Sequence, residues 1–312
     1  MSYPRLPFLF LPVMRAELPG WGWLCQKLRL TSPAHNYRWK DAPVVTMRGK
    51  WHGYLMELRL SYWSDRLTYF LGRSIELEVP LAMRRLLRPG DLFIDIGANI
   101  GMIMLQGSQL VGPSGRVICF EPNPTCLDRL RRLASSNDLE TLMVHPMALG
   151  SRDDTLKLTV IDDDPGMGTL AGEGIPADRI SASYEVPVRR GDDVLAGLDR
   201  PPAVIKLDVE GFELEALQGL DQTLASHRPA VLMEYHADSL IRAGASQSKV
   251  VAFFEERGYL GYAMSTRRRM RRHRLVLTPI SAEETGPTNC DALWIHRDDP
   301  RRDRIALLIA RR

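Results

Sequence analysis

The chain alternates between short apolar runs and amphipathic stretches from residue 91 onward. Each apolar run has the length of a buried strand and ends in polar or turn-forming residues. The expected strands lie at 92–96, 116–121, 141–149, 203–209, 230–236 and 290–298. Between them, leucines recur at helical spacing, as in the stretch that follows Asn123 and Pro124, a cap and first-turn pair. Strands that alternate with helices predict a mostly parallel sheet covered on both faces, and hence an α/β fold.

Other parts of the chain depart from this alternation. Residues 74–88 predict a helix, whereas segment 150–200 contains extra strand-like runs. Residues 1–75 are rich in Pro and Trp, and within them only 54–63 alternates as a strand would. We therefore expect an N-terminal extension over 1–73, a main domain over 74–298 and a basic C-terminal tail over 299–312.

Composition narrows the class of protein. An apolar fraction of 45% and a charged fraction of 25% are ordinary for a soluble globular protein, and a net charge of +3 does not imply nucleic acid. The four cysteines form no CxxC pair, which favours a reduced, cytoplasmic chain. Prolines break the apolar run at 1–20, so no transmembrane segment is expected. Trp21 and Trp23 are expected to pack on the main domain, with contact to a membrane surface as the alternative.

A glycine-rich turn follows the first expected strand, in "DLFIDIGANIG" (91–101). In doubly wound sheets the ligand lies outside the carboxyl ends of the strands, so this turn faces the expected site. Gly97 would let the chain turn where a Cβ would clash, and Gly101 would let the next helix begin close to a ligand. The second strand ends in Glu121, where a carboxylate could hold the two hydroxyls of a ribose.

Two cofactors compete for this turn. A dinucleotide would use G-x-G-x-x-G, with backbone amides on a pyrophosphate, but the chain has G-A-N-I-G. Asp95, at the strand end, would repel a phosphate and attract an amino group. S-adenosylmethionine has an ammonium, a sulfonium, a ribose and no phosphate, so it fits better. A tight turn beside a solvated acid is the alternative without a ligand.

Four motifs then occur in a familiar order: "FIDIGANIG", "VICFEPNP", "IKLDVEGFELEALQG" and "VLMEYH". Over about residues 70–265 the chain resembles the FkbM-type family of S-adenosylmethionine-dependent methyltransferases. The resemblance implies a class I methyltransferase (Rossmann-like) fold, with a seven-stranded sheet whose last strand is antiparallel. It also implies methyl transfer, often to hydroxyls of sugars or natural products. The cofactor-binding residues expected on these grounds are Asp95, Gly97, Ala98, Asn99, Gly101 and Glu121.

Acidic side chains also end the fourth and fifth expected strands. Asp208 and Glu210 follow one strand and His236 ends the next, so all three would face the cofactor crevice. Methyl transfer needs an aligned acceptor oxygen and removal of its proton, which makes these three the candidate catalytic residues. Glu234, together with Asp208 and Glu210, could instead hold a divalent cation, although no metal is our main expectation.

Each candidate also has a structural alternative. Asp208 could only hold the loop, and Glu210 could cap the following helix, where the dipole favours an acid. Lys206 is expected to snorkel or to pair with a neighbouring acid. His236 could be a satisfied histidine at a strand end.

The run "TRRRMRRHRL" (266–275) carries six Arg and one His within residues 267–274. It is expected to be a solvated loop between the last two strands. Binding of an anionic acceptor is the alternative, and nucleic acid is disfavoured because no aromatic residues interleave the run.

The sequence thus predicts a methyltransferase that acts on a hydroxyl of a carbohydrate or secondary metabolite. A nicotinamide-dependent oxidoreductase and a non-catalytic binding protein that retains the fold remain the alternatives. Intact Gly97, Gly101 and Glu121 argue against the second of these. The identity of the acceptor, the role of residues 1–73 and the oligomeric state are not specified by the sequence.

Overall fold

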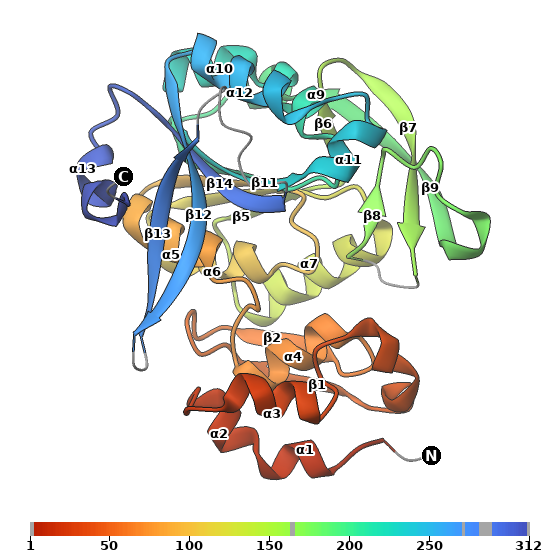
Figure 1. Ribbon diagram of the computed structural model, residues 1–312. Helices are drawn as coiled ribbons and strands as arrows, with labels where there is room; N and C mark the ends of the chain where they lie inside the picture. The colour runs from red at the N-terminus through yellow and green to blue at the C-terminus, as the bar shows by residue number, and fades with distance from the viewer. Residues whose placement is uncertain (1–2, 163–165, 270–271, 281–288, 311–312) are drawn as a thin grey trace.

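One large sheet organises the computed structural model, which describes residues 3–162, 166–269, 272–280 and 289–310 (Figure 1). The strand order is β13-β12-β14-β11-β10-β3-β4-β5. Strands β11, β10, β3, β4 and β5 are parallel, and β14 is antiparallel to both of its neighbours. The strands are β3 (Leu92–Ile96), β4 (Arg116–Phe120), β5 (Leu142–His145), β10 (Pro202–Leu207), β11 (Ala230–His236), β12 (Tyr259–Arg269), β13 (Arg272–Ile280) and β14 (Asn289–His296). The predicted α/β fold is confirmed.

The sheet differs from the prediction by an eighth strand. The last strand in the chain, β14, is antiparallel as predicted, but β13 adds a further antiparallel strand at the edge. The arginine run therefore does not form the predicted loop: Arg267 and Arg268 pair in register with Arg274 and His273 across the β12–β13 hairpin. The hairpin forms because the chain beyond the run places alternate residues, such as Leu275 and Leu277, in the core.

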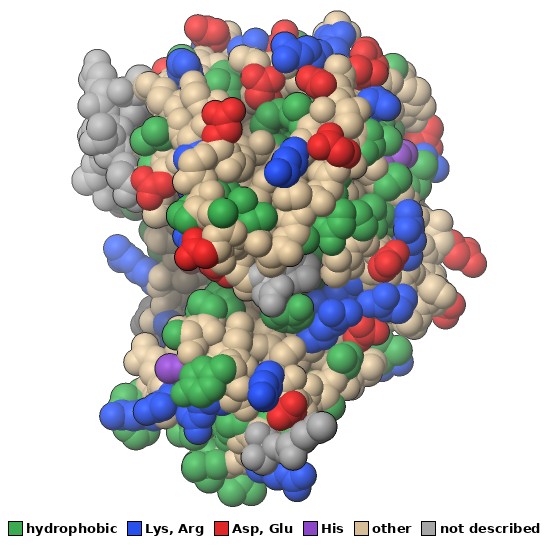
Figure 2. Space-filling model, turned by 90° about the vertical axis from the view of Figure 1, so that its right-hand side faces the viewer, with side chains coloured by type: hydrophobic (Ala, Val, Ile, Leu, Met, Phe, Trp, Pro, Cys, Tyr) green, Lys and Arg blue, Asp and Glu red, His purple; other side chains and the backbone are tan. Residues whose placement is uncertain are grey.

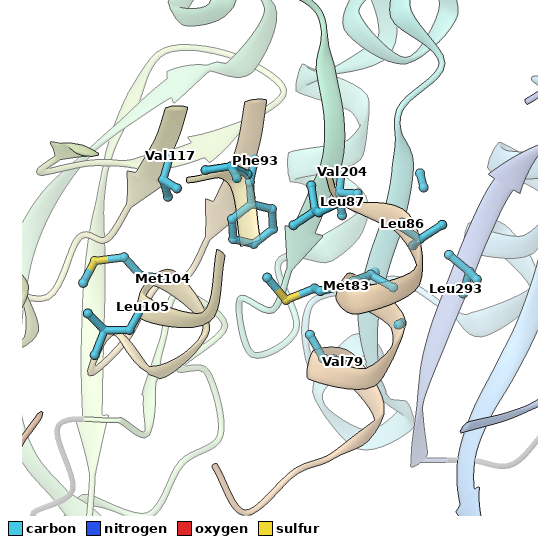
Figure 3. Packing of buried hydrophobic residues seen from close by; sticks show 14 of the residues in the cluster. Val79, Met83, Leu86, Leu87, Phe93, Met104, Leu105, Val117, Val204 and Leu293 are labelled. Atoms are coloured by element: carbon cyan, nitrogen blue, oxygen red, sulfur yellow. The ribbon is translucent and has the colours of Figure 1, made fainter. Parts of the chain in front are cut away.

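Helices cover both faces of the sheet, as predicted (Figure 1). On one face lie α5 (Glu78–Leu86), α6 (Met102–Val111) and α7 (Pro124–Ser136), whose apolar side chains share one buried cluster with β3, β4 and β10. In Figure 3, Met83 of α5 and Met104 of α6 lie on either side of Phe93. The other face carries α8 (Gly191–Leu195), α9 (Glu213–Gly219), α10 (Asp221–His227), α11 (Ala237–Arg242) and α12 (Gln247–Glu256).

The segment between β5 and β10 forms a second, four-stranded sheet with the order β6-β9-β7-β8. Its strands are β6 (Ala148–Gly150), β7 (Asp154–Ile161), β8 (Gly168–Thr169) and β9 (Ile180–Arg190), so extra strands occur where the sequence predicts them. The single strand expected at 141–149 is wrong, because the chain leaves the main sheet after His145 and enters the second sheet at Ala148.

The N-terminal residues form a layer below α6 and α7 (Figure 1). It comprises α1 (Leu6–Leu9), α2 (Leu11–Arg15), α3 (Trp21–Lys27), the 3-10 helix η1 (Pro33–Trp39), the hairpin β1 (Val44–Arg48) and β2 (Leu55–Arg59), and α4 (Trp63–Leu71). The strand expected at 54–63 is shorter than predicted, since α4 begins at Trp63. The layer has its own buried cluster, which includes Met14, Cys25, Trp39 and Phe70.

A buried acid joins this layer to the β12–β13 hairpin. Glu17 is 5% exposed, and its carboxylate lies 2.7 Å from Lys50 Nζ, 2.9 Å from Arg73 Nε and 2.8 Å from His273 Nε2. Arg268 donates a hydrogen bond to the Glu17 carbonyl. Burial alone would raise the pKa of Glu17, but hydrogen bonds from Arg73 and Lys50 hold that pKa far below its usual range. We call these five residues the Glu17 cluster.

The C-terminal residues also pack against the sheet. Helix α13 (Arg302–Ile305) and the 3-10 helix η3 (Ala306–Leu308) place Ile305 in the main core, and Ile309 bridges to Leu277 of β13. Within the described residues, no helix has both the length and the apolar character needed to cross a membrane.

A second buried ion pair joins α4 to α7, and it should be important for stability. Arg129 Nη1 and Nη2 lie 2.9 and 3.1 Å from the two carboxylate oxygens of Asp65, and both side chains are less than a tenth exposed. Arg129→Met should lower the free energy of unfolding by about 3–5 kcal/mol, because Asp65 would stay buried without its partner. Chemical denaturation would measure the change. Arg131→Met, on the exposed side of α7, should change it by less than about 0.5 kcal/mol, and equal effects would contradict the prediction.

Candidate active site

The turn after β3 is held against the end of β10. Gly97 has a φ of +79°, and a Cβ at this position would lie 1.9 Å from the carbonyl oxygen of Asp208. The N–H groups of Gly97 and Ala98 both donate to Phe120 O, while Lys206 Nζ donates to Gly97 O at 2.7 Å. Only glycine fits such a close approach in this conformation, so the turn has a single geometry.

Glu121 closes the next strand end, as predicted. Its Oε2 accepts from the Asn99 N–H at 2.7 Å, and its Oε1 accepts from the Asn123 N–H at 2.8 Å. Asn123 also caps α7, where its side chain accepts from the Thr125 N–H, which confirms the cap expected there. Burial raises the pKa of Glu121 to about 7, although both backbone donors favour the charged form. The carboxylate is thereby fixed in place beside the glycine turn.

A cavity of about 660 Å³ opens between this turn and the second sheet. Gly97, Asn99 and Glu121 line its polar side. Its walls are apolar, made by Phe120, Met147, Leu149, Leu158, Leu170 and Phe212. The sequence did not identify these wall residues, because Leu158 and Leu170 reach the cavity only through the folding of the inserted sheet.

Three of the residues expected to bind a cofactor, Asp95, Ala98 and Gly101, lie outside the lining of this cavity. Asp95 is fully buried behind the turn, 3.4 Å from Lys206 Nζ; burial raises its pKa, and the lysine opposes that rise. Gly101 has a φ of +85°, and a Cβ there would lie 2.8 Å from Leu130 Cδ2. A glycine at position 101 therefore lets α6 pack closely on α7. We had expected it to let the helix begin close to a ligand. Ala98 lines a neighbouring cavity instead.

This second cavity, of about 950 Å³ and open to solvent, adjoins the first. Both cavities are lined by Asn99, Gly166, Asp208 and Glu210. The N-terminal residues contribute much of the remaining wall, namely Trp63, Ser64, Thr68, Ser74, Ile75 and Glu76. Strand ends and N-terminal layer therefore enclose one continuous site.

Three acids gather at the strand ends beside this cavity. Asp208, Glu210 and Glu234 bring carboxylate oxygens within 4.8 Å of one another. Asp208 lies 3.1 Å from Lys206 Nζ; burial would raise its pKa, but the lysine holds that pKa below its usual value. Burial and the nearby Asp208 raise the pKa of Glu234 well above its usual range, and the two carboxyl groups share a hydrogen bond. The opposite directions of the two pKa shifts favour a proton on Glu234 and a charge on Asp208.

Glu210 does not cap the following helix, so that alternative is wrong. Helix α9 begins at Glu213 after Phe212 and has no side-chain cap, and the carboxylate of Glu213 accepts from the N–H groups of Val209 and Gly211 in the preceding loop. Glu210 has a φ of +53°, and its carbonyl accepts from Thr169 Oγ1 at 2.7 Å. Burial, followed by repulsion from neighbouring acids, raises the pKa of Glu210 to about 7.

Three further titratable residues lie next to these acids: His236, Asp291 and Lys206. His236 Nε2 lies 2.8 Å from Glu234 Oε1, and its side chain is 41% exposed and lines neither cavity. Asp291 pairs with Glu234 across β11 and β14, and burial raises its pKa to about 8. Asp291 could not be found from the sequence, because only strand register places it here. Lys206 pairs with Asp95 and Asp208, which confirms the expected pairing with a neighbouring acid.

Oxygen ligands at this spacing suit a hard divalent cation. However, the Lys206 ammonium already lies against Asp208 and supplies a positive charge at the same position. The described arginines of the run 267–274 line neither cavity.

Three features lie at the carboxyl edge of a sheet whose last strand is antiparallel. They are the turn at Gly97, the fixed carboxylate of Glu121 and the acidic second cavity. A sheet of this order with a site at this edge defines a class I methyltransferase. The family model described as the methyltransferase FkbM domain matches residues 95–260, and the chain belongs to this family. It is therefore a methyltransferase, as the resemblance implied.

Similar proteins carry related names. Methyltransferase sdnD of Sordaria araneosa is 31% identical over 200 residues, which cover 55% of this chain and 74% of that protein. Hexuronic acid methyltransferase AglP of Haloferax volcanii is 30% identical over 148 residues, which cover 47% and 56%. Among solved structures, methyltransferase FkbM from Methylobacillus flagellatus has a TM-score of 0.38 at 16% identity, covering 87% of this chain and 60% of that one.

Proposed function

We propose that this chain transfers a methyl group from S-adenosylmethionine to a hydroxyl of a carbohydrate or a secondary metabolite. The observation that carries the proposal is the junction of the two cavities at Asn99, Asp208 and Glu210. One cavity offers a glycine turn and a carboxylate for a nucleoside, and the other offers acids that can accept a proton. Adjoining cavities suit a reaction in which donor and acceptor must be held in line.

The cofactor would be held by Gly97, Asn99 and Glu121. Each oxygen of Glu121 accepts one backbone N–H and keeps a lone pair for a ribose hydroxyl. Asp95 would act indirectly, through Lys206, which donates to the carbonyl of Gly97. When bound, S-adenosylmethionine supplies an electrophilic methyl group on its sulfonium. The apolar walls of the first cavity suit its base.

Hydroxyl groups fit the second cavity because carboxylates accept hydrogen bonds from them. The charged residues of its lining are Glu76, Asp208 and Glu210, with Lys206 as the cation among the described residues. An anionic group on the acceptor would have to lie away from these acids. The name of AglP, a hexuronic acid methyltransferase, supports a carbohydrate.

Glu210 would accept the proton of the acceptor hydroxyl, since a group with a pKa near 7 exchanges protons efficiently at neutral pH. Asp208, kept ionised by Lys206, would orient that hydroxyl. His236 lines neither cavity, so it would influence the reaction only through its contact with Glu234. The N-terminal wall, residues 63–76, would cover the acceptor and exclude water.

Calorimetric titration with S-adenosylmethionine and, separately, NAD⁺ tests this proposal. S-adenosylmethionine should bind in the micromolar range, and Glu121→Gln should weaken binding by about 10–100-fold, because an amide offers one acceptor oxygen fewer. Glu121 has its pKa raised to about 7, so the carboxylate is lost as the pH falls. Affinity should accordingly drop severalfold from about pH 8 to about pH 6 in the parent and stay flat in Glu121→Gln.

The matched control is Glu140→Gln, which changes an exposed carboxylate outside both cavities. It should leave affinity and pH dependence unchanged. Binding of NAD⁺ in place of S-adenosylmethionine would favour the oxidoreductase. Folded protein that binds neither would favour the non-catalytic binding protein.

A further inference from the structure

The N-terminal layer carries a charge opposite to that of the rest of the chain. Residues 1–50 contain eight Lys or Arg and two acidic residues, a net charge of +6, whereas the remaining residues have a net charge of −3. Of the two acids, Glu17 is buried and paired with Lys50 and Arg73, so Asp41 is the exposed one. The exposed cations include Arg5, Lys27, Arg29 and Lys40.

The same layer exposes large apolar side chains. Leu6, Leu9, Trp23 and Tyr37 are 58%, 76%, 63% and 68% exposed. Together with Val44, they are five of the nine large hydrophobic residues that are exposed in the described part of the chain. In the face drawn in Figure 2, the lower part of the molecule shows hydrophobic and basic side chains with few acidic ones. Exposed apolar residues concentrated in this way mark an interaction surface.

These side chains lie on neighbouring elements. Leu6 and Leu9 are three residues apart in α1 and so share a helix face. Phe8 packs from the same helix onto Trp39 of η1, the 3-10 helix that also carries Tyr37, with ring centroids 6.2 Å apart. Lys27 Nζ lies 5.8 Å from the ring of Trp23 in α3. Apolar and cationic groups are therefore interleaved.

We propose that residues 5–40 form a surface that docks on an anionic lipid membrane. Leucine, tryptophan and tyrosine would enter the headgroup region, while Lys and Arg would face the lipid phosphates and carboxylates. The layer lies on the membrane and does not cross it, consistent with its short helices. A protein partner would need shape complementarity, whereas the net charge of +6 matches an extended negative surface.

Cosedimentation with phosphatidylcholine vesicles, with and without phosphatidylserine, tests the proposal. The full chain should bind the anionic vesicles at low salt, lose binding at high salt, and bind neutral vesicles at least tenfold more weakly. Lys27→Gln and Arg29→Gln should each weaken binding about fivefold. The double variant Leu9→Glu and Trp23→Glu should abolish it.

Leu307→Glu is the matched apolar control, since Leu307 is 99% exposed in η3, away from the N-terminal layer (Figure 1). It should bind vesicles as the parent does, and thermal unfolding should show that all variants are folded. The proposal is overturned if the parent does not bind anionic vesicles, or if it binds neutral ones equally. It is also overturned if Leu307→Glu loses as much binding as the double variant, or if size-exclusion chromatography shows a dimer that the double variant dissociates.

Discussion

Replacing Glu210 with glutamine is expected to lower kcat by about 10²–10⁴-fold at saturating S-adenosylmethionine. Burial, with a contribution from Asp208, raises the pKa of Glu210 to about 7, and the residue lines both cavities. A glutamine keeps the shape and cannot accept the proton of the acceptor hydroxyl. Single-turnover methyl transfer to an acceptor found by mass spectrometry would measure the effect.

The pH profile separates proton transfer from a structural role. A base with a raised pKa is active only when ionised, so kcat of the parent should fall as the pH drops through about 7, and the variant should lose this dependence. The pKa of Glu121 is also raised to about 7, but at saturating S-adenosylmethionine a change in cofactor affinity does not alter kcat. Glu173→Gln, an exposed control, should behave as the parent does. A variant with the full kcat would show that Glu210 is not the proton acceptor.

Gly97→Ala is expected to weaken binding of S-adenosylmethionine by at least about 100-fold, since displacements near 1 Å have effects of this size on enzyme sites. The added Cβ would lie 1.9 Å from the carbonyl oxygen of Asp208, so the turn or the end of β10 must move. That movement would also break the contact of Lys206 with the Gly97 carbonyl. Calorimetry would measure the affinity.

Gly53→Ala is the control for backbone strain. Gly53 has a φ of +77°, close to that of Gly97, and nothing lies within 4 Å of the position of a Cβ. This variant should lose only about 1 kcal/mol of stability and keep its cofactor affinity. Gly97→Ala should show a lower melting temperature than Gly53→Ala. Equal melting temperatures and equal affinities would show that the close approach at Gly97 has no role.

Local signals in the sequence predicted much of the fold. The cap at Asn123, the proline after it and the leucine spacing of α7 are all short-range features, and the structure retains each of them. The strand ends could also be predicted, because the apolar runs of β4 and β10 stop directly before Glu121 and Asp208. Topology then brought Gly97 and Asp208 together, since parallel neighbours end at the same edge of the sheet.

Long-range packing accounts for what the sequence did not show. Asp291 enters the acidic group through register with Glu234, and Trp63 reaches the second cavity because the N-terminal layer folds over the strand ends. We did not predict that the arginine run belongs to a hairpin, because a run of charged residues is typical of a solvated loop. Its strands are instead held by the sheet edge and by residues such as Leu277. None of these placements follows from a window of neighbouring residues.

The Glu17 cluster also sets an order of events during synthesis. Glu17 and His273 are 256 positions apart, so a nascent chain needs roughly 13–50 s to make the second after the first at ordinary translation rates. Lys50 and Arg73 emerge soon after Glu17 and can pair with it, whereas Arg268 and His273 are made long afterwards. The contact between the N-terminal layer and the β12–β13 hairpin can therefore form only after the earlier strands of the main sheet have been made.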